Sequence, residues 1–169
     1  MTLDDKQPRD EVDAIMKAWR KVRADVDTSP MEVFSRVSRL ARQLDLRRRQ
    51  AFMAQGLDTW EFDVLSSLRR AGEPFQLTPG QLMTELLVSS GTMTNRIDRL
   101  ESKGLVRRSP SPRDRRGIYV SLTADGIARV DGALERLLAV ERELLAPVSD
   151  DDACQISRLL RAILVPLDS

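Results

Sequence analysis

The segment from Glu85 to Thr123 constrains the fold more than any other part of the chain, because five local patterns follow one another without a gap. A turn leads into an amphipathic helix, which is followed by a strand, an arginine-rich loop and a second strand. Serines at the start of the helix can cap it, and Gly104 can take the left-handed conformation that ends it. The apolar residues of this helix recur at helical spacing and predict one buried stripe: Met93, Ile97 and Leu100.

The opposite face of this helix carries side chains that suit the edges of DNA bases. Short hydroxyls, an amide and a guanidinium are the groups that read base edges in a major groove. Four such residues are present on the predicted outer face: Ser90, Thr92, Asn95 and Arg99. We therefore expect this helix to be the recognition helix of a DNA-binding head.

A β-wing is predicted directly after the recognition helix. Leu105–Ser109 and Ile118–Leu122 can pair as strands around the loop of residues 110–117. The window 96–116 holds eight Arg or Lys and three acids, a local charge of +5, whereas the whole chain carries +1. An arginine-rich hairpin alone could be a solvated loop, but beside a recognition helix it favours phosphate and minor-groove contacts. The expected wing contacts are Arg113, Asp114, Arg115 and Arg116, with the aspartate orienting the loop.

Capping residues and apolar periodicity predict helices on both sides of this head. The fold class is mainly α with a small β-wing, namely a winged helix-turn-helix with a helical dimerisation lobe and an extra N-terminal helix. The predicted helices are one that ends near Asp27, one from Ser29 to Gln55, one from Asp58 to near Ala71, a short one after Thr78, a long one after Thr123 and a last one capped by Ser149.

The predicted organisation has three parts. Residues 1–28 form the extra helix, residues 29–57 and 124–169 the dimerisation lobe, and residues 58–123 the DNA-binding domain. The broad apolar faces of the last two helices could pack within the chain. We favour a homodimer, because two heads about 34 Å apart read an inverted repeat with shared affinity and register. The cluster Arg47–Arg49 could touch DNA, solvent or a partner subunit.

Composition argues against an enzyme. The chain has no histidine, which removes Ser-His and Cys-His nucleophiles and histidine metal sites, and it has no glycine-rich phosphate loop. We expect no cofactor and no metal. A single cysteine, Cys154, cannot form an internal disulfide, which suits a reducing cytoplasm, and we expect it to pack rather than act as a thiol switch. An acidic N-terminus without an apolar segment predicts neither a signal peptide nor a membrane span.

The stretch from Leu86 to Thr123 resembles the MarR family of winged-helix regulators. The resemblance rests on SSGTMTNRIDRLESKGLVRR, on the DRRG wing and on the VSLT strand end, with Gly126 behind it. The order of elements in that family also matches Met31 to Leu167. This resemblance implies a homodimeric, ligand-responsive DNA-binding protein, commonly a repressor of a divergent neighbouring gene.

The urate-responsive members of that family offer a closer resemblance. They carry a tryptophan on an extra N-terminal helix, an aspartate in the core helix, and arginines in the recognition helix and the next strand. The matching residues are Trp19, Asp63, Arg96 and Arg108, which implies a site for a planar anion such as urate or a related purine.

The residues themselves support part of this effector hypothesis. Arg96 lies about 60° from Met93 around the helix, so it can point back into the protein and hold an anion. We expect Asp63 to pair with an arginine when the site is empty and, once an anion displaces it, to pull on Arg108.

Simpler interpretations of the same residues remain open. Trp19 could only anchor its helix, and Asp63 could form a structural ion pair with Arg96 or Arg108. The effector could instead be a phenolic acid or an antibiotic, or the protein could bind DNA without any ligand. Replacing Trp19 or Arg96 separates these cases, because only the urate-type site predicts a lost ligand response with DNA binding retained.

Overall fold

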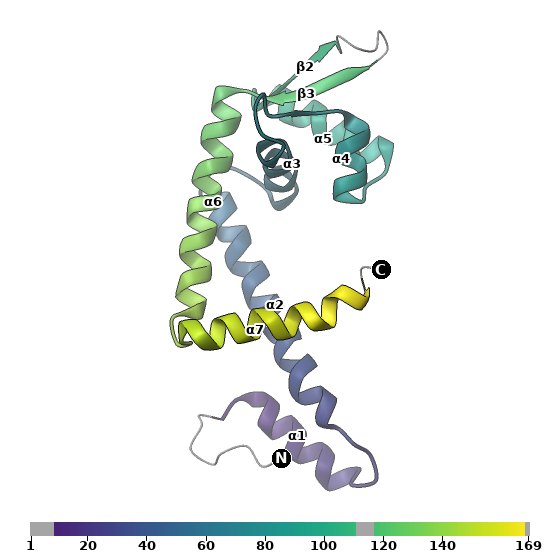
Figure 1. Ribbon diagram of the computed structural model, residues 1–169, viewed down its shortest axis with the longest axis vertical. Helices are drawn as coiled ribbons and strands as arrows, with labels where there is room; N and C mark the ends of the chain where they lie inside the picture. Colours follow the sequence, from purple (N-terminus) through teal and green to yellow (C-terminus); the bar gives the residue numbers. More distant parts are fainter. Residues whose placement is uncertain (1–8, 111–116, 168–169) are drawn as a thin grey trace. The chain divides into compact units, whose positions relative to one another are not determined.

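The computed structural model describes residues 9–110 and 117–167, and the chain forms two compact units, Met1–Leu46 and Arg47–Ser169. The first unit contains α1 (Glu11–Val22) and most of α2 (Ser29–Met53). The second contains the end of α2 and all later elements (Figure 1). These two units do not coincide with the three functional parts predicted from the sequence, and that functional division stays a prediction.

In the first unit, α1 is tied to α2 by ion pairs. Arg36 of α2 lies 2.8 Å from Asp10, which caps α1, and 2.8 Å from Asp13 in its first turn. The hydrogen bond from Arg36 is the largest cause of the lowered pKa of Asp10, and burial opposes it. Val12 and Met16 are buried. The helix ends at Val22, short of the predicted end near Asp27, because Arg23 leaves helical geometry and pairs with Asp25.

The second unit is built on three helices and a small sheet. The helices α3 (Thr59–Arg70), α4 (Pro79–Leu86) and α5 (Ser90–Ser102) precede the hairpin of β2 (Val106–Pro110) and β3 (Ile118–Leu122), as Figure 1 shows. Then follow α6 (Ala124–Leu145), α7 (Asp150–Leu164) and a short 3-10 turn, Val165–Leu167. One cluster of buried apolar side chains joins α3 to α6 and the sheet, and it includes Phe52, Leu65, Leu82, Ile97, Val120 and Val130.

The predicted caps explain why the helices begin where they do. Asp58 with Glu61 and Thr78 with Gln81 form capping boxes, and Ser89, Thr123 and Ser149 accept backbone N–H bonds at the starts of α5, α6 and α7. The predicted glycine stop after α5 is also confirmed, since Gly104 has a φ of 71°, and Gly56 after α2 has a similar φ of 68°. The mainly helical fold with a β-wing therefore agrees with the prediction.

The sheet contains a strand that the sequence did not reveal. The order is β1-β3-β2, all antiparallel, where β1 is only Gln76–Leu77. In the wing, Arg108 pairs with Val120 and Arg107 with Ser121. On the other edge, Leu77 also pairs with Val120. The third strand fixes the base of the hairpin to the segment between α3 and α4.

The Arg47–Arg49 cluster has an intramolecular role that was not among the three predicted ones. Arg48 lies 2.6 Å from Glu141 of α6, and Arg47 lies 3.9 Å from Glu143. Arg69 similarly joins α3 to α6, at 2.9 Å from Asp131. The first two pairs join the end of α2 to α6, and the third joins α3 of the DNA-binding head to α6, all within the second unit.

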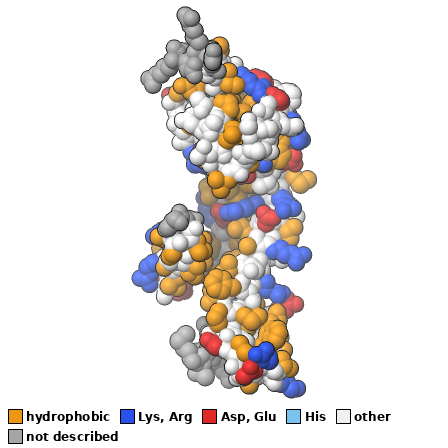
Figure 2. All heavy atoms as spheres, turned by 90° about the vertical axis from the view of Figure 1, so that its right-hand side faces the viewer, with side chains coloured by type: hydrophobic (Ala, Val, Ile, Leu, Met, Phe, Trp, Pro, Cys, Tyr) orange, Lys and Arg blue, Asp and Glu red, His pale blue; other side chains and the backbone are white. Residues whose placement is uncertain are grey.

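The last helix exposes an apolar face. Within this chain α7 buries no residue, and its exposed apolar residues are Ile156, Leu159, Leu160, Ile163 and Leu164. Figure 2 shows hydrophobic side chains in orange on the surface of the protein. Cys154 is exposed too, so its predicted packing role is wrong for the single chain. Among the described residues, every helix is too short or too polar to cross a membrane.

Candidate nucleic-acid interface and effector residues

The two faces of α5 divide as the sequence predicts. Met93, Ile97 and Leu100 are at most 2% exposed and anchor the helix in the core. The four predicted base-reading residues all lie exposed: Ser90, Thr92, Asn95 and Arg99. The Thr92 hydroxyl is 3.0 Å from that of the capping Ser89, so part of its hydrogen-bonding capacity already serves the helix start.

The guanidinium of Arg99 has an aromatic partner that sequence reasoning missed. Its Cζ lies 5.0 Å from the ring centroid of Trp60, and that of Arg96 lies 5.6 Å from the same ring. Both separations are typical of cation–π contacts. Trp60 stands in the first turn of α3, half-buried and packed against the core cluster. The sequence shows that Arg96 and Arg99 are three residues apart on one helix. It does not show that both lie near Trp60, which belongs to a different helix.

Two carboxylate contacts fix the C-terminal half of α5. Lys103, the C-cap residue, places Nζ 2.6 Å and 2.8 Å from the two carboxylate oxygens of Glu61, whose side chain is fully buried. Glu61 also accepts the backbone N–H of Asp58 at the start of α3. One buried carboxylate thus serves a helix cap and the end of the recognition helix.

Arg108 provides the second connection, from β2 to α5. Its guanidinium lies 2.5 Å from Asp98 and 2.5 Å from Glu101, and its backbone N–H donates to Glu101 at 3.0 Å. Burial lowers the pKa of Arg108. The hydrogen bonds and the negative charges of Asp98 and Glu101 together raise it by more, so the net pKa lies above the ordinary value. Arg108 therefore links the wing strand to the recognition helix through both its side chain and its backbone N–H.

These pairings reduce the positive charge that is available to phosphates. Residues 96–110 contain five cations, of which Lys103 and Arg108 are held by carboxylates. Arg107 donates to the Ser121 hydroxyl at 3.2 Å. The predicted wing contacts Arg113, Asp114, Arg115 and Arg116 lie outside the described residues.

Asp63 lies half-buried on α3, among three arginines. Burial raises its pKa, and attraction to Arg96, Arg70 and Arg48 opposes that effect in decreasing order. Among the described residues, Asp63 has no ion pair within 4 Å, so the predicted pairing with Arg96 is only a longer-range attraction. Arg70 and Arg48 are paired elsewhere, with Glu85 and Glu141. The site therefore combines a desolvated carboxylate with one half-buried arginine, Arg96.

This environment predicts how stability depends on the charge of Asp63. Since its folded pKa is raised above the ordinary 3.8, its contribution to stability is full below that value and is lost as the pH rises through the raised pKa. We expect Asp63→Asn to raise the melting temperature at pH 7, with the difference shrinking as the pH falls towards 4. Calorimetry across this range checks the sign, and a less stable variant at pH 7 would show that the arginines outweigh burial.

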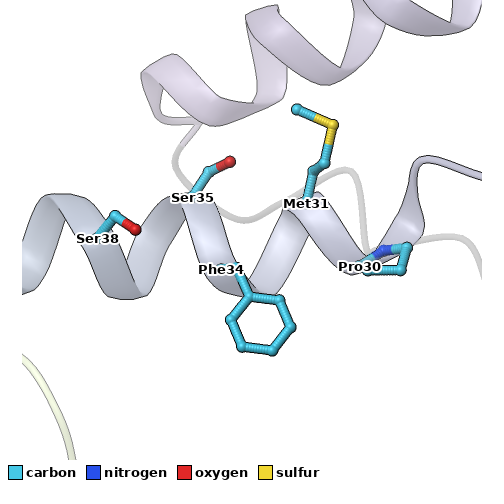
Figure 3. Close-up of a pocket in the computed structure, with 5 residues that line it drawn as sticks. All are labelled: Pro30, Met31, Phe34, Ser35 and Ser38. Carbon is cyan, nitrogen blue, oxygen red and sulfur yellow. The ribbon is translucent and has the colours of Figure 1, made fainter.

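A shallow surface hollow in the first unit is not a candidate for anion binding. Figure 3 shows it along the start of α2, lined by Pro30, Met31, Phe34, Ser35 and Ser38. Its lining carries no charged side chain, so nothing there would offset the desolvation of an anion. Trp19 also belongs to the first unit, on α1, where it is 43% exposed.

Comparison with known proteins agrees with this geometry. A family model described as the MarR family matches residues 55–117. The regulator PecS of Dickeya dadantii is 36% identical over 150 residues, which cover 89% of this chain and 90% of PecS. The multiple antibiotic resistance protein MarR of Salmonella typhimurium is 37% identical over 105 residues, 62% of this chain and 71% of MarR.

Solved structures show the same fold. AbsC of Streptomyces coelicolor, a MarR family transcriptional regulator, superposes with a TM-score of 0.73 at 21% identity, over 85% of this chain and 97% of AbsC. A mutant of E. coli MarR, crystallised with operator DNA, superposes with a TM-score of 0.62 at 28% identity, over 79% of this chain and 97% of that one. With its exposed recognition-helix face and its wing, the chain belongs to the MarR family of DNA-binding transcriptional regulators.

Proposed function

We propose that this regulator is a homodimeric repressor that a small planar anion, such as urate or a related purine, releases from an inverted-repeat operator. The observation that carries the DNA-binding part is the exposed polar face of α5, opposite a stripe that is completely buried. Dimerisation is supported by the uncovered apolar face of α7, since a surface of this kind is expected to find a partner.

The proposed base contacts are Ser90, Thr92, Asn95 and Arg99, with the wing residues Arg113, Asp114, Arg115 and Arg116 at the adjacent minor groove. Arg99→Ala should cost about 1–3 kcal/mol of discrimination against the wrong base. Arg115→Ala should instead weaken binding to all sequences and flatten the salt dependence. Anisotropy titrations of specific and random duplexes at several salt concentrations check both. Equal losses in the two variants would contradict the division between base and phosphate contacts.

The proposed effector residues in the second unit are Asp63, Arg96 and Arg108. Burial raises the pKa of Asp63, so beside an incoming anion this carboxylate takes up a proton more readily than a solvated carboxylate would. Arg96 is half-buried and can offer a bidentate contact to a planar anion. Trp19 is proposed as a further effector residue on the grounds of the family resemblance.

Release of DNA would require a change at α5. In the described structure Arg108 is engaged with Asp98 and Glu101, so an effector that draws Arg108 away must first break these two pairs. Their loss would weaken the link between the recognition helix and the wing strand, although the backbone N–H of Arg108 would still donate to Glu101. A coupling of about 1–3 kcal/mol between effector and operator changes affinity roughly 5- to 150-fold.

One experiment tests operator and effector together. The protein is titrated onto the intergenic DNA upstream of its own gene, without ligand and with urate, xanthine or salicylate. We expect urate or xanthine to lower affinity within the range given above. Arg96→Gln and Trp19→Phe should keep DNA binding within a few-fold but lose the response. A response to salicylate alone would indicate the phenolic class, and no response to any compound would refute effector control while leaving DNA binding intact.

A further inference from the structure

The side chain of Trp60 connects the core helix α3 to the exposed face of the recognition helix. It lies one residue before the buried Glu61 and packs partly against the core cluster, so its indole has a fixed place. Trp60 is the aromatic surface over which two arginines of α5 lie.

Two guanidiniums use this surface. Arg96 and Arg99 stand three residues apart on α5, and their Cζ atoms lie 5.6 Å and 5.0 Å from the indole centroid. Residues at this spacing are neighbours on one side of a helix. Tryptophan is the aromatic side chain that attracts a cation most strongly, because of the quadrupole of its ring. The contact therefore depends on an aromatic ring at this position and not only on apolar packing.

An arginine that contacts a DNA base binds more favourably when its side chain is already held in one conformation. A free arginine side chain has many rotamers, and fixing it on DNA costs up to about 2 kcal/mol of conformational entropy. Arg99 is exposed to solvent, yet its charged end already lies over a fixed ring. A side chain that is preorganised in this way loses less entropy when it binds.

We propose that Trp60 is a positioning residue for DNA reading, which holds the Arg99 guanidinium over its indole so that the exposed face of α5 meets the bases in a restricted geometry. The inference rests on the proposed base contact of Arg99. It adds to that contact a residue from α3 that itself need not touch DNA.

The first test asks whether the contact exists in solution. The chain contains two tryptophans, so Trp19→Phe labelled with 5-fluorotryptophan gives a single ¹⁹F resonance from Trp60. Arg99→Ala and Arg96→Ala should each shift this resonance. Arg107→Ala is the matched control, because its side chain bonds to Ser121 and not to the indole, and it should leave the resonance in place. A resonance that is insensitive to Arg99→Ala overturns the proposal.

The second test measures the effect on recognition. A preferred duplex is first selected from a random pool by the unsubstituted protein, and affinity for it is compared with affinity for random-sequence duplex. Trp60→Leu should lower this specificity ratio about two- to fivefold, the range of an exposed cation–π contact. Trp60→Phe, which keeps an aromatic face, should retain most of the ratio. In an Arg99→Ala background, Trp60→Leu should have no further effect.

The outcomes separate this inference from the proposed function. If Arg99→Ala lowers the ratio but Trp60→Leu does not, the base contact stands and the positioning role is refuted. A higher ratio or tighter binding in Trp60→Leu also refutes it, because the indole would then withhold Arg99 from DNA. If Arg99→Ala leaves the ratio unchanged, the base contact fails and the inference falls with it. Melting temperatures of all variants distinguish these results from a loss of folding, and Trp60→Phe provides a conservative variant if Trp60→Leu does not fold.

Discussion

Replacing Lys103 with methionine is expected to lower the free energy of unfolding by about 2–3 kcal/mol. The reason is the carboxylate that the substitution leaves behind. The Glu61 side chain is fully buried, and Lys103 lies 2.6 Å from its Oε1. The other oxygen also accepts the Asp58 N–H, but among the described residues Oε1 has only the ammonium as a partner. Breaking a buried pair in this way usually costs about 3–5 kcal/mol, and the value is reduced here because Lys103 is 43% exposed and water can reach the site.

Urea denaturation measures this change, and a double substitution identifies its cause. Glu61→Gln keeps an oxygen for the Asp58 N–H and removes the charge, so Glu61→Gln with Lys103→Met should be less destabilised than Lys103→Met alone. Arg20→Met removes an ion pair with Glu32 whose arginine is 63% exposed, and it should change stability by less than about 1 kcal/mol. If Lys103→Met were no worse than Arg20→Met, the buried carboxylate would not depend on Lys103.

The sequence predicts the helices well because their boundaries are set by local chemistry. Thr78, Ser89, Thr123 and Ser149 each accept the N–H of the residue three positions ahead, so the pattern lies within one turn. The end of α1 was misplaced because apolar spacing continues to Val26 although the backbone leaves the helix at Arg23. The strand β1 was missed because two residues cannot show an alternating pattern.

The candidate site divides in the same way. The exposed face of α5 follows from the 3.6-residue period, and it was predicted. The partners that hold α5 come from distant parts of the chain: Glu61 and Lys103 are 42 residues apart, and Trp60 meets arginines of another helix. A single sequence does not reveal which of its 27 basic and 26 acidic residues will form ion pairs with one another. For the same reason Asp63 was expected to have a direct arginine partner, which the structure does not provide.

Gly126→Ala should destabilise the second unit by about 3 kcal/mol or more, at the upper end of the effects of overpacking. Gly126 lies in the first turn of α6, against the start of the wing. A Cβ atom there would stand 2.0 Å from the carbonyl oxygen of Leu105 and 3.3 Å from Cδ2 of Leu122. The nearest atom belongs to the backbone, so no side-chain rotation relieves the contact.

The clash would also break the hydrogen bonds that join α6 to the wing. The Leu105 oxygen accepts the backbone N–H of Thr123 at 3.1 Å, and the Thr123 hydroxyl donates to the Gly104 oxygen at 2.7 Å. To accommodate a methyl group, α6 must move away from β2 and stretch both bonds. Gly91→Ala is the matched control, because a Cβ on this helical glycine meets nothing within 4 Å, and helix propensity predicts a gain of up to about 1 kcal/mol. Urea denaturation of the two variants should therefore give changes of opposite sign in the free energy of unfolding. A Gly126→Ala variant as stable as the unsubstituted protein would show that the backbones of α6 and the wing do not approach this closely in solution.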